Sequence, residues 1–212
     1  MIFDPSKPPL TDSAGLLKSI PVEAGPEIWK RDTRVISSGL CDLQVNGFAG
    51  VDYNDPTLMP EEFEKSLFAM LSTGVTTCLP TVITGSEDWQ IQCFHALEAG
   101  RNASKLAQAM VPGYHLEGPF LNPEEGFCGC HPTKWMRSAT WDHFERLQEA
   151  AGGRITLITV APEIKGVLDL IPKWVEKGIA VAIGHCNPDR DTLLRAADAG
   201  ATLSTHLGNG IA

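Results

Sequence analysis

The 212-residue sequence lacks the features of several common protein classes. No uninterrupted apolar run reaches the roughly 18 residues that a membrane-spanning helix needs, and the acidic, proline-rich start does not match a secretory signal peptide. Basic residues are in the minority: 17 Lys and Arg stand against 26 Asp and Glu, which gives a net charge of −9. This balance argues against nonspecific nucleic-acid binding, but it allows a local site for an anionic small molecule. The lack of a spanning apolar run argues against a membrane as partner.

Several catalytic and nucleotide-binding motifs are also missing. No Gly-x-Gly-x-x-Gly follows the first predicted strand, no Gly-x-x-x-x-Gly-Lys loop is present, and no Ser-His-Asp or Cys-His arrangement can be recognised. Paired Cys-x-x-Cys spacing is absent as well, and the cysteines are scattered through segments that look structured: Cys41, Cys78, Cys93, Cys128, Cys130 and Cys186. This distribution favours a reduced cytoplasmic protein over a disulfide scaffold.

What is present is a regular alternation of strands and helices. With 43% hydrophobic and 20% charged residues the chain is typical of an ordered globular protein. Residues 1 to about 38 form a short lead-in rich in Pro, Ser and Gly, without a core of its own. Six strands are predicted after it, at residues 40–45, 75–82, 110–116, 155–161, 179–184 and 201–205, with about five helices between them.

This alternation predicts an α/β fold with a parallel sheet and right-handed crossovers. The two common forms are an open, doubly wound sheet and a (β/α)8 TIM barrel. Polar residues end several of the strands, which fits the mouth of a barrel better than a single crevice. We therefore predict a partial barrel over residues 39–212, with only about six of the eight strands that a barrel needs.

Three of these strand ends carry potential metal ligands. Glu117 follows the third strand, His185 the fifth and His206 the sixth. A catalytic zinc site takes three imidazole or carboxylate ligands and keeps one position open, and a bound ion polarises a carbonyl oxygen and lowers the pKa of water. The alternative is that each histidine only caps a loop or packs against a neighbour. The coincidence of three such residues favours the metal site.

The long loop after Glu117 holds another candidate, His131, which would lie over the same mouth and could hydrogen-bond a substrate. Cys128, Cys130 and His131 together suggest a second metal only weakly, because structural zinc sites use a different spacing. His115 lies two residues before Glu117 and therefore points to the same face of the strand. We interpret His115 as a residue that supports the ligands or packs beside them.

Several motifs occur in the order in which one enzyme family carries them. They are Leu43-Gln-Val-Asn-Gly47, Gly74-Val-Thr-Thr77, Leu79-Pro-Thr81, His115-Leu-Glu-Gly-Pro119, Gly129-Cys-His-Pro132, Ala161-Pro-Glu163, Gly184-His185, Gly200-Ala-Thr202 and Thr205-His-Leu207 with Asn209. From about Gly39 to its end the chain resembles the N-acetylglucosamine-6-phosphate deacetylase family of the amidohydrolase superfamily, whose members are (β/α)8 barrels.

The resemblance implies roles for individual residues. Glu117, His185 and His206 match the ligands of one divalent metal ion, with Zn expected first and Fe, Mn or Co as alternatives. Gln44 and Asn46 match the pair that replaces a second metal site, and His131 matches the histidine that contacts the acetamido group. Asn209 and Gly210 match positions at the sugar phosphate. The implied reaction is deacetylation of N-acetylglucosamine 6-phosphate in amino-sugar catabolism, by an enzyme that is a homodimer in the family.

The sequence also departs from the family pattern. His206-Leu-Gly-Asn-Gly-Ile211 lacks an aromatic residue that the family has after the leucine, so a substrate with a different N-acyl group or a cyclic amide is one alternative. The family's general base is an Asp on the eighth strand, and the N-terminal lead-in would be a remnant of a small β domain. We therefore expect a C-terminally truncated relative with impaired activity. A non-catalytic paralogue, or a sequence that is part of a longer protein, is the other alternative.

Overall fold

The computed structural model describes residues 38–208, so most of the predicted lead-in, and Asn209 and Gly210, lie outside the described residues. From Cys41 onward the chain forms one compact unit. The strands are β1 (Leu40–Val45), β2 (Gly47–Phe48), β3 (Val51–Asp52), β4 (Val75–Ile83), β5 (Tyr114–Glu117), β6 (Ile155–Val160), β7 (Ala180–Ile183) and β8 (Leu203–Ser204). The helices are α1 (Pro60–Leu71), α2 (Glu87–Ala103), α3 (Lys105–Met110), the short 3₁₀ helix η2 (Thr133–Trp135), α4 (Trp141–Ala150), α5 (Val167–Glu176) and α6 (Arg190–Asp198).

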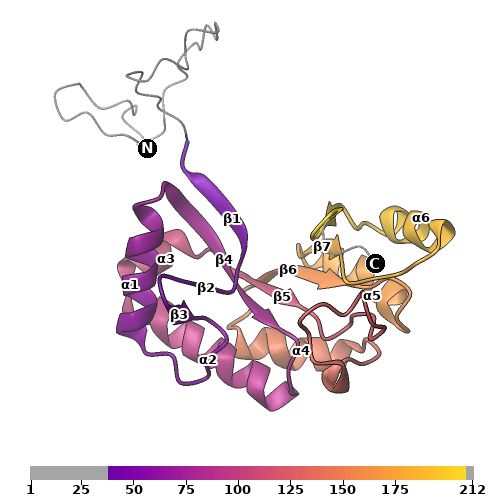
Figure 1. Cartoon of the computed structure of the whole chain (residues 1–212), viewed down its shortest axis with the longest axis horizontal. Helices are drawn as coiled ribbons and strands as arrows, with labels where there is room; N and C mark the ends of the chain where they lie inside the picture. The colour runs from indigo at the N-terminus through magenta and orange to yellow at the C-terminus, as the bar shows by residue number, and fades with distance from the viewer. Residues whose placement is uncertain (1–37, 209–212) are drawn as a thin grey trace, which may run out of the picture. The chain divides into compact units, whose positions relative to one another are not determined.

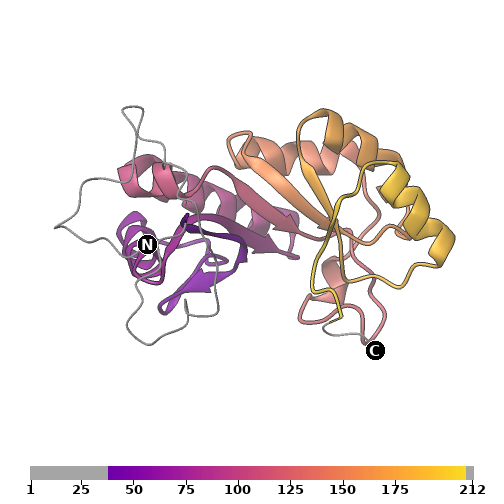
Figure 2. The same cartoon turned by 90° about the horizontal axis from the view of Figure 1, so that it is seen from above.

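Six strands form one sheet in the order β1-β4-β5-β6-β7-β8, which is also their order along the chain (Figure 1). From β4 to β8 every neighbouring pair is parallel. Between consecutive strands of the sheet the chain passes through helices, as in a (β/α) barrel, and Figure 2 shows these helices from a second side. The predicted fold class and the six main strands are confirmed. The antiparallel β2–β3 pair is an addition that the sequence did not predict.

The two faces of the sheet have different surroundings. Side chains such as Val82, Leu116 and Ile158 belong to the large core that also contains the buried faces of the helices. The opposite face carries a small apolar cluster of Leu79, Leu157 and Ala182. Because side chains alternate along a strand, the polar residues Thr81, His115, Glu117 and Thr159 share that second face. In a barrel this face is the interior, and here it carries the candidate site at the ends of the strands.

Local sequence signals explain most helix starts. The Ser86 side chain accepts a hydrogen bond from Trp89 N and caps α2. One predicted boundary is wrong. The third strand was expected from Met110, but Ser104 caps the additional helix α3, which includes Met110, and β5 begins only at Tyr114. Asp189 caps α6 by accepting a hydrogen bond from Thr192 N.

Within residues 38–208, none of the helices has the length and apolar character that crossing a membrane requires. All six cysteines are free, with Cys78 and Cys93 buried among apolar side chains. Burial raises the pKa of each of these two thiols to about 12, so both are neutral packing residues.

Candidate metal centre

Three strand ends bring Glu117, His185 and His206 together. Glu117 is the last residue of β5, while each histidine follows its strand, β7 or β8, by two residues. Their potential ligand atoms all lie within 4.8 Å of one another. Within residues 38–208 this is the one group of at least three His, Cys, Asp or Glu side chains with such a spacing, so Cys128, Cys130 and His131 do not form a second one.

Glu117 is the centre of this group. It is 2% exposed, and its Oε1 lies 3.3 Å from His185 Nε2 and 3.2 Å from His206 Nε2. Its Oε2 lies 3.7 Å from His131 Nε2. Burial by itself raises the pKa of this carboxyl group. The hydrogen bond with His185 and the neighbouring imidazoles outweigh burial and lower the pKa to about 2. The carboxylate is therefore ionised at neutral pH and available as a ligand.

The orientation of His185 bears directly on whether a metal fits. Its Nδ1 lies 3.0 Å from the carbonyl oxygen of Phe127, to which only an N–H can donate. In neutral His185 the Nε2 therefore carries a lone pair, and this lone pair points at the ionised Glu117. Two facing lone pairs repel unless a cation lies between them. A second proton on the imidazole or a metal ion satisfies that requirement, and the pKa of His185 is raised by its hydrogen bond to Glu117.

Both histidines have an unusual backbone conformation. The φ angle is 51° at His185 and 56° at His206, in the left-handed region that non-glycine residues seldom occupy. Such a conformation costs on the order of 1–3 kcal/mol per residue and is concentrated at functional sites. A turn of this kind directs each imidazole back over the strand end toward Glu117. At Gly129, in the loop over the site, a Cβ would lie 3.0 Å from His185 Cε1, so a side chain there would press on the ring.

His131 lies beside the group, with its ring next to the Glu117 carboxylate. It is 3% exposed, and its Nδ1 lies 2.9 Å from Thr84 Oγ1 and accepts from Thr84 N at 3.4 Å. Burial lowers the pKa of His131 to about 4, so the ring is neutral at neutral pH. Because Nδ1 accepts, the proton is on Nε2, which faces Glu117. His131 therefore presents one N–H donor to the space beside the carboxylate.

The remaining predicted site residues differ in position. Gln44, on β1, reaches the site, with its Nε2 3.5 Å from His206 Nε2. Asn46 is exposed, and its backbone carbonyl accepts hydrogen bonds from Tyr53 N and Asn54 Nδ2. Asn209 and Gly210 are outside the described residues. The structure thus places Gln44 and His131 beside the three potential ligands and gives no comparable contact to Asn46.

Some residues that contact the site are not of a metal-ligand type, and the sequence analysis did not identify them. Thr84 holds His131, the Phe127 carbonyl orients His185, and Thr159 and Thr205 hydrogen-bond to each other at 2.8 Å behind the histidines. The position of Thr159 could have been recognised from the sequence, because it lies two residues after Leu157 in a strand and therefore points to the same face of the sheet. A carbonyl contact such as that of Phe127 has no sequence signal.

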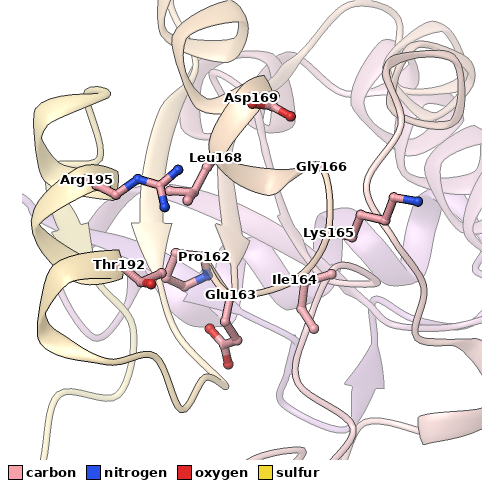
Figure 3. A pocket seen from close by; sticks show the side chains of 9 residues that line it. All are labelled: Pro162, Glu163, Ile164, Lys165, Gly166, Leu168, Asp169, Thr192 and Arg195. Carbon is pink, nitrogen blue, oxygen red and sulfur yellow. The ribbon is translucent and has the colours of Figure 1, made fainter.

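A separate pocket of about 290 Å³ lies between the β6–α5 loop and α6 (Figure 3). Thr192 and Arg195 of α6 line it, together with Glu163 and Lys165 of the loop. None of the three potential metal ligands lines this pocket. Glu163 connects the pocket with the site region, since its Oε1 accepts from Asn122 Nδ2 at 2.9 Å and from Asn187 N at 2.6 Å.

Comparison with known proteins shows what the chain is similar to. No protein-family model matches the sequence. Over 174 residues the chain is 34% identical to the N-acetylglucosamine-6-phosphate deacetylase of Haemophilus influenzae, a match that covers 82% of this chain and 44% of the relative. Over 207 residues it is 34% identical to the N-acetylgalactosamine-6-phosphate deacetylase of a Shewanella strain, which covers 93% of this chain and 48% of the relative.

Solved structures give the same result. A Mycobacterium smegmatis N-acetyl-D-glucosamine-6-phosphate deacetylase mutant, in complex with N-acetyl-D-glucosamine-6-phosphate, superposes with a TM-score of 0.73 and 29% identity. That match covers 82% of this chain and 43% of the other. The chain therefore spans about half the length of the relatives that it matches, and both its sequence and its fold resemble theirs.

Proposed function

The chain is a relative of the N-acetylglucosamine-6-phosphate deacetylases, and from this premise we propose that it carries the metal-binding half of a deacetylase site for an N-acetylated amino-sugar phosphate. The observation that carries the proposal is the convergence of His185 and His206 on one oxygen of the buried, ionised Glu117. This donor set suits one divalent ion, and zinc is the ion that we propose first. Two imidazoles and a carboxylate are typical ligands of catalytic zinc and leave one coordination position open. When bound, such an ion polarises an amide carbonyl and activates water.

The side chains around this donor set have separate roles in the proposal. His131 donates its Nε2–H to the acetamido group of the substrate, and burial keeps the ring neutral, so that it contributes no charge that would compete with the ion. Thr84 fixes the ring in that orientation. Gln44 borders the site from β1 and limits the space beside His206. We keep Asn46, Asn209 and Gly210 as substrate contacts on the strength of the family resemblance alone.

The reaction also needs a group that accepts and returns a proton. Within residues 38–208, Glu117 is the one carboxylate that lies within 4.0 Å of a nitrogen of His131, His185 or His206. A ligand cannot also act as an independent base. We therefore propose that the base is outside the described residues and, on the strength of the family resemblance alone, that this chain by itself deacetylates poorly.

The identity of the sugar is a second question. The relative from Shewanella is named for N-acetylgalactosamine 6-phosphate, which differs from the glucosamine substrate only in the configuration at C4. We propose N-acetylglucosamine 6-phosphate as the substrate, because most relatives carry that name. A panel of both sugar phosphates and their unphosphorylated forms separates the two, and it also tests the alternative of a different N-acyl substrate.

Two further expectations concern the protein as a whole. Six free thiols suit a reducing compartment, which supports a cytoplasmic location. A homodimer is expected from the family, and sizing of the purified chain in solution tests it. A chain that binds neither metal nor sugar phosphate would instead support a non-catalytic paralogue.

The decisive experiment measures metal binding by the full 212-residue chain. Zn²⁺ and Co²⁺ are titrated calorimetrically into the metal-free protein and into the variants Glu117→Gln, His185→Asn and His206→Asn. Each substitution removes one donor, and we expect each to weaken binding at least tenfold. His95→Asn is the matched control, because His95 is exposed on α2 and far along the chain from every strand end of the site. Equal affinity of His185→Asn and His95→Asn would refute the proposed centre.

A further inference from the structure

Two threonines meet across a strand that separates them. Thr159 is on β6 and Thr205 follows β8, with β7 between these strands in the sheet. Their hydroxyl groups nevertheless lie 2.8 Å apart. Gly184, directly after β7, makes this possible. A Cβ at Gly184 would lie 2.8 Å from Thr205 Cβ and 2.9 Å from Thr159 Cγ2, so any side chain would occupy the space through which the two threonines touch.

Further polar contacts connect Thr159 with the strands on the other side of the sheet. Thr159 Oγ1 lies 2.7 Å from Nε2 of the buried His115 on β5. His115 Nδ1 lies 3.4 Å from Thr81 Oγ1 on β4. Thr81 Oγ1 in turn accepts from the backbone N–H of Val45 on β1 at 3.1 Å. We call Thr81, His115, Thr159 and Thr205 the polar brace. It connects β1, β4, β5 and β6 with the end of β8.

The hydrogen bonds of the brace can form a chain in which each group donates to its neighbour in the same direction. The Thr81 hydroxyl donates to the Leu79 carbonyl at 3.1 Å, so its oxygen is left to accept from His115 Nδ1–H. Neutral His115 then has an acceptor at Nε2, which takes the hydroxyl proton of Thr159. Thr159 oxygen accepts from the Thr205 hydroxyl. Every hydroxyl and both ring nitrogens have a partner, as a buried polar network must have if it is to stabilise the fold.

The brace runs beside the candidate ligands. Thr205 immediately precedes His206, Val45 immediately follows Gln44, and His115 lies two residues before Glu117 on the same strand face. β8 consists of only two residues, and the His206 side chain is 43% exposed. His206 therefore has little packing of its own to hold it at Glu117. The hydroxyl contact of Thr205 with Thr159 ties the residue that precedes His206 to the buried sheet.

We propose that Thr205, through Thr159 and His115, is a positioning residue that holds His206 at Glu117 before any ion binds, and that Gly184 is glycine because this contact must pass over β7. The inference rests on the proposed metal centre, and none of these residues is assigned to touch the ion or the substrate. Contacts of this kind behind a ligand typically change metal affinity by about 10–100-fold when removed.

The test compares three variants of the full chain. Thr205→Val keeps the shape and removes the hydroxyl, and Thr205→Ser keeps the hydroxyl and removes the methyl. Gly184→Ala places a methyl group between the two threonines. We expect Thr205→Val and Gly184→Ala to lower the Co²⁺ affinity by about 10–100-fold and Thr205→Ser to stay within threefold of the wild type. Far-UV circular dichroism shows that each variant is folded.

A second measurement needs no metal. The ring nitrogens of His115 in ¹⁵N-labelled metal-free protein report which nitrogen carries the proton. We expect the Nδ1–H form with Nε2 accepting, and a changed Nε2 signal in Thr159→Val. Co²⁺ affinity of Thr205→Val equal to that of Thr205→Ser would overturn the proposal. If His206→Asn leaves affinity unchanged, the ligand assignment fails instead, and the His115 signals alone then decide whether the brace exists.

Discussion

The Thr81 hydroxyl offers a sharp test of how the first strand is held at the site. Thr81 is fully buried, and its Oγ1 contacts Val45 N and the Leu79 carbonyl, both at 3.1 Å, and His115 Nδ1 at 3.4 Å. Thr81→Val keeps the volume and the branching and removes only these hydrogen bonds. Val45 is itself 5% exposed, so its N–H does not gain water in exchange.

The magnitude follows from these contacts. Leaving a buried donor unsatisfied costs about 1–3 kcal/mol, and Thr81→Val affects two donors, Val45 N–H and His115 Nδ1–H. The new buried methyl group returns about 0.8 kcal/mol. Two donors at about 2 kcal/mol each, less about 0.8 kcal/mol for the methyl group, give a net loss of about 3 kcal/mol in the free energy of unfolding. At about 2–4 °C per kcal/mol for a domain of this size, that loss corresponds to about 6–12 °C in Tm.

Urea unfolding of the full chain, followed by tryptophan fluorescence, measures this loss as a shift in midpoint with an unchanged slope. Thr81→Ser retains the hydroxyl and removes a methyl group, so it should lose only about 1 kcal/mol. Thr156→Val is the second control, because Thr156 is exposed on β6, and it should stay within about 0.5 kcal/mol of the wild type. The reasoning is refuted if Thr81→Val is as stable as Thr81→Ser.

Two other predictions concern the site loop and the acid side of the pH range. Gly118 has a φ of 83°, and a Cβ there would lie 2.1 Å from Thr84 Oγ1. Gly118→Ala should therefore lower Tm more than Gly153→Ala, whose φ is 76° with no atom within 4 Å of the Cβ; equal shifts would show that the clash is relieved without cost. Burial lowers the pKa of His143 and the charges of Arg137 and Arg146 add to this, although Glu87 opposes them. As the pH falls, the unfolded chain therefore binds a proton at His143 before the folded chain does, and the free energy of unfolding should fall below about pH 6.5. The variant His143→Gln should lose less stability than the wild type between pH 7 and pH 5. Equal losses in urea titrations at the two pH values would contradict this.

The sequence predicted the strand–helix alternation because its signals are local. Ser86 caps α2 and Pro60 begins α1, and both are recognisable within a few residues. Where two local signals compete, the sequence alone does not decide between them. Asn187-Pro188 looks like a helix start, but Asn187 N donates to Glu163, and Asp189 caps the helix instead. Met110 was interpreted as the start of a strand, whereas it is the last residue of the helix that Ser104 caps.

The candidate ligands were also identified from the sequence, because a carboxylate or an imidazole that follows a predicted strand can be recognised without the tertiary structure. The sequence alone predicted that Glu117, His185 and His206 would meet if their strands were neighbours in a barrel. It could not predict that both histidines face one oxygen of Glu117, or that the Phe127 carbonyl fixes the proton on His185. Those facts depend on a loop that folds over the strand ends.

What the sequence by itself determined is therefore the type of fold, the order of the strands and the identity of the groups that end them. Only the tertiary structure decided how these groups are held. Thr159 and Thr205 are 46 residues apart, and their hydroxyl groups meet because the residue directly after the strand between them is a glycine. Contacts of this kind depend on distances between strands and on the room that one absent side chain leaves. Local propensity and residue spacing do not encode either quantity.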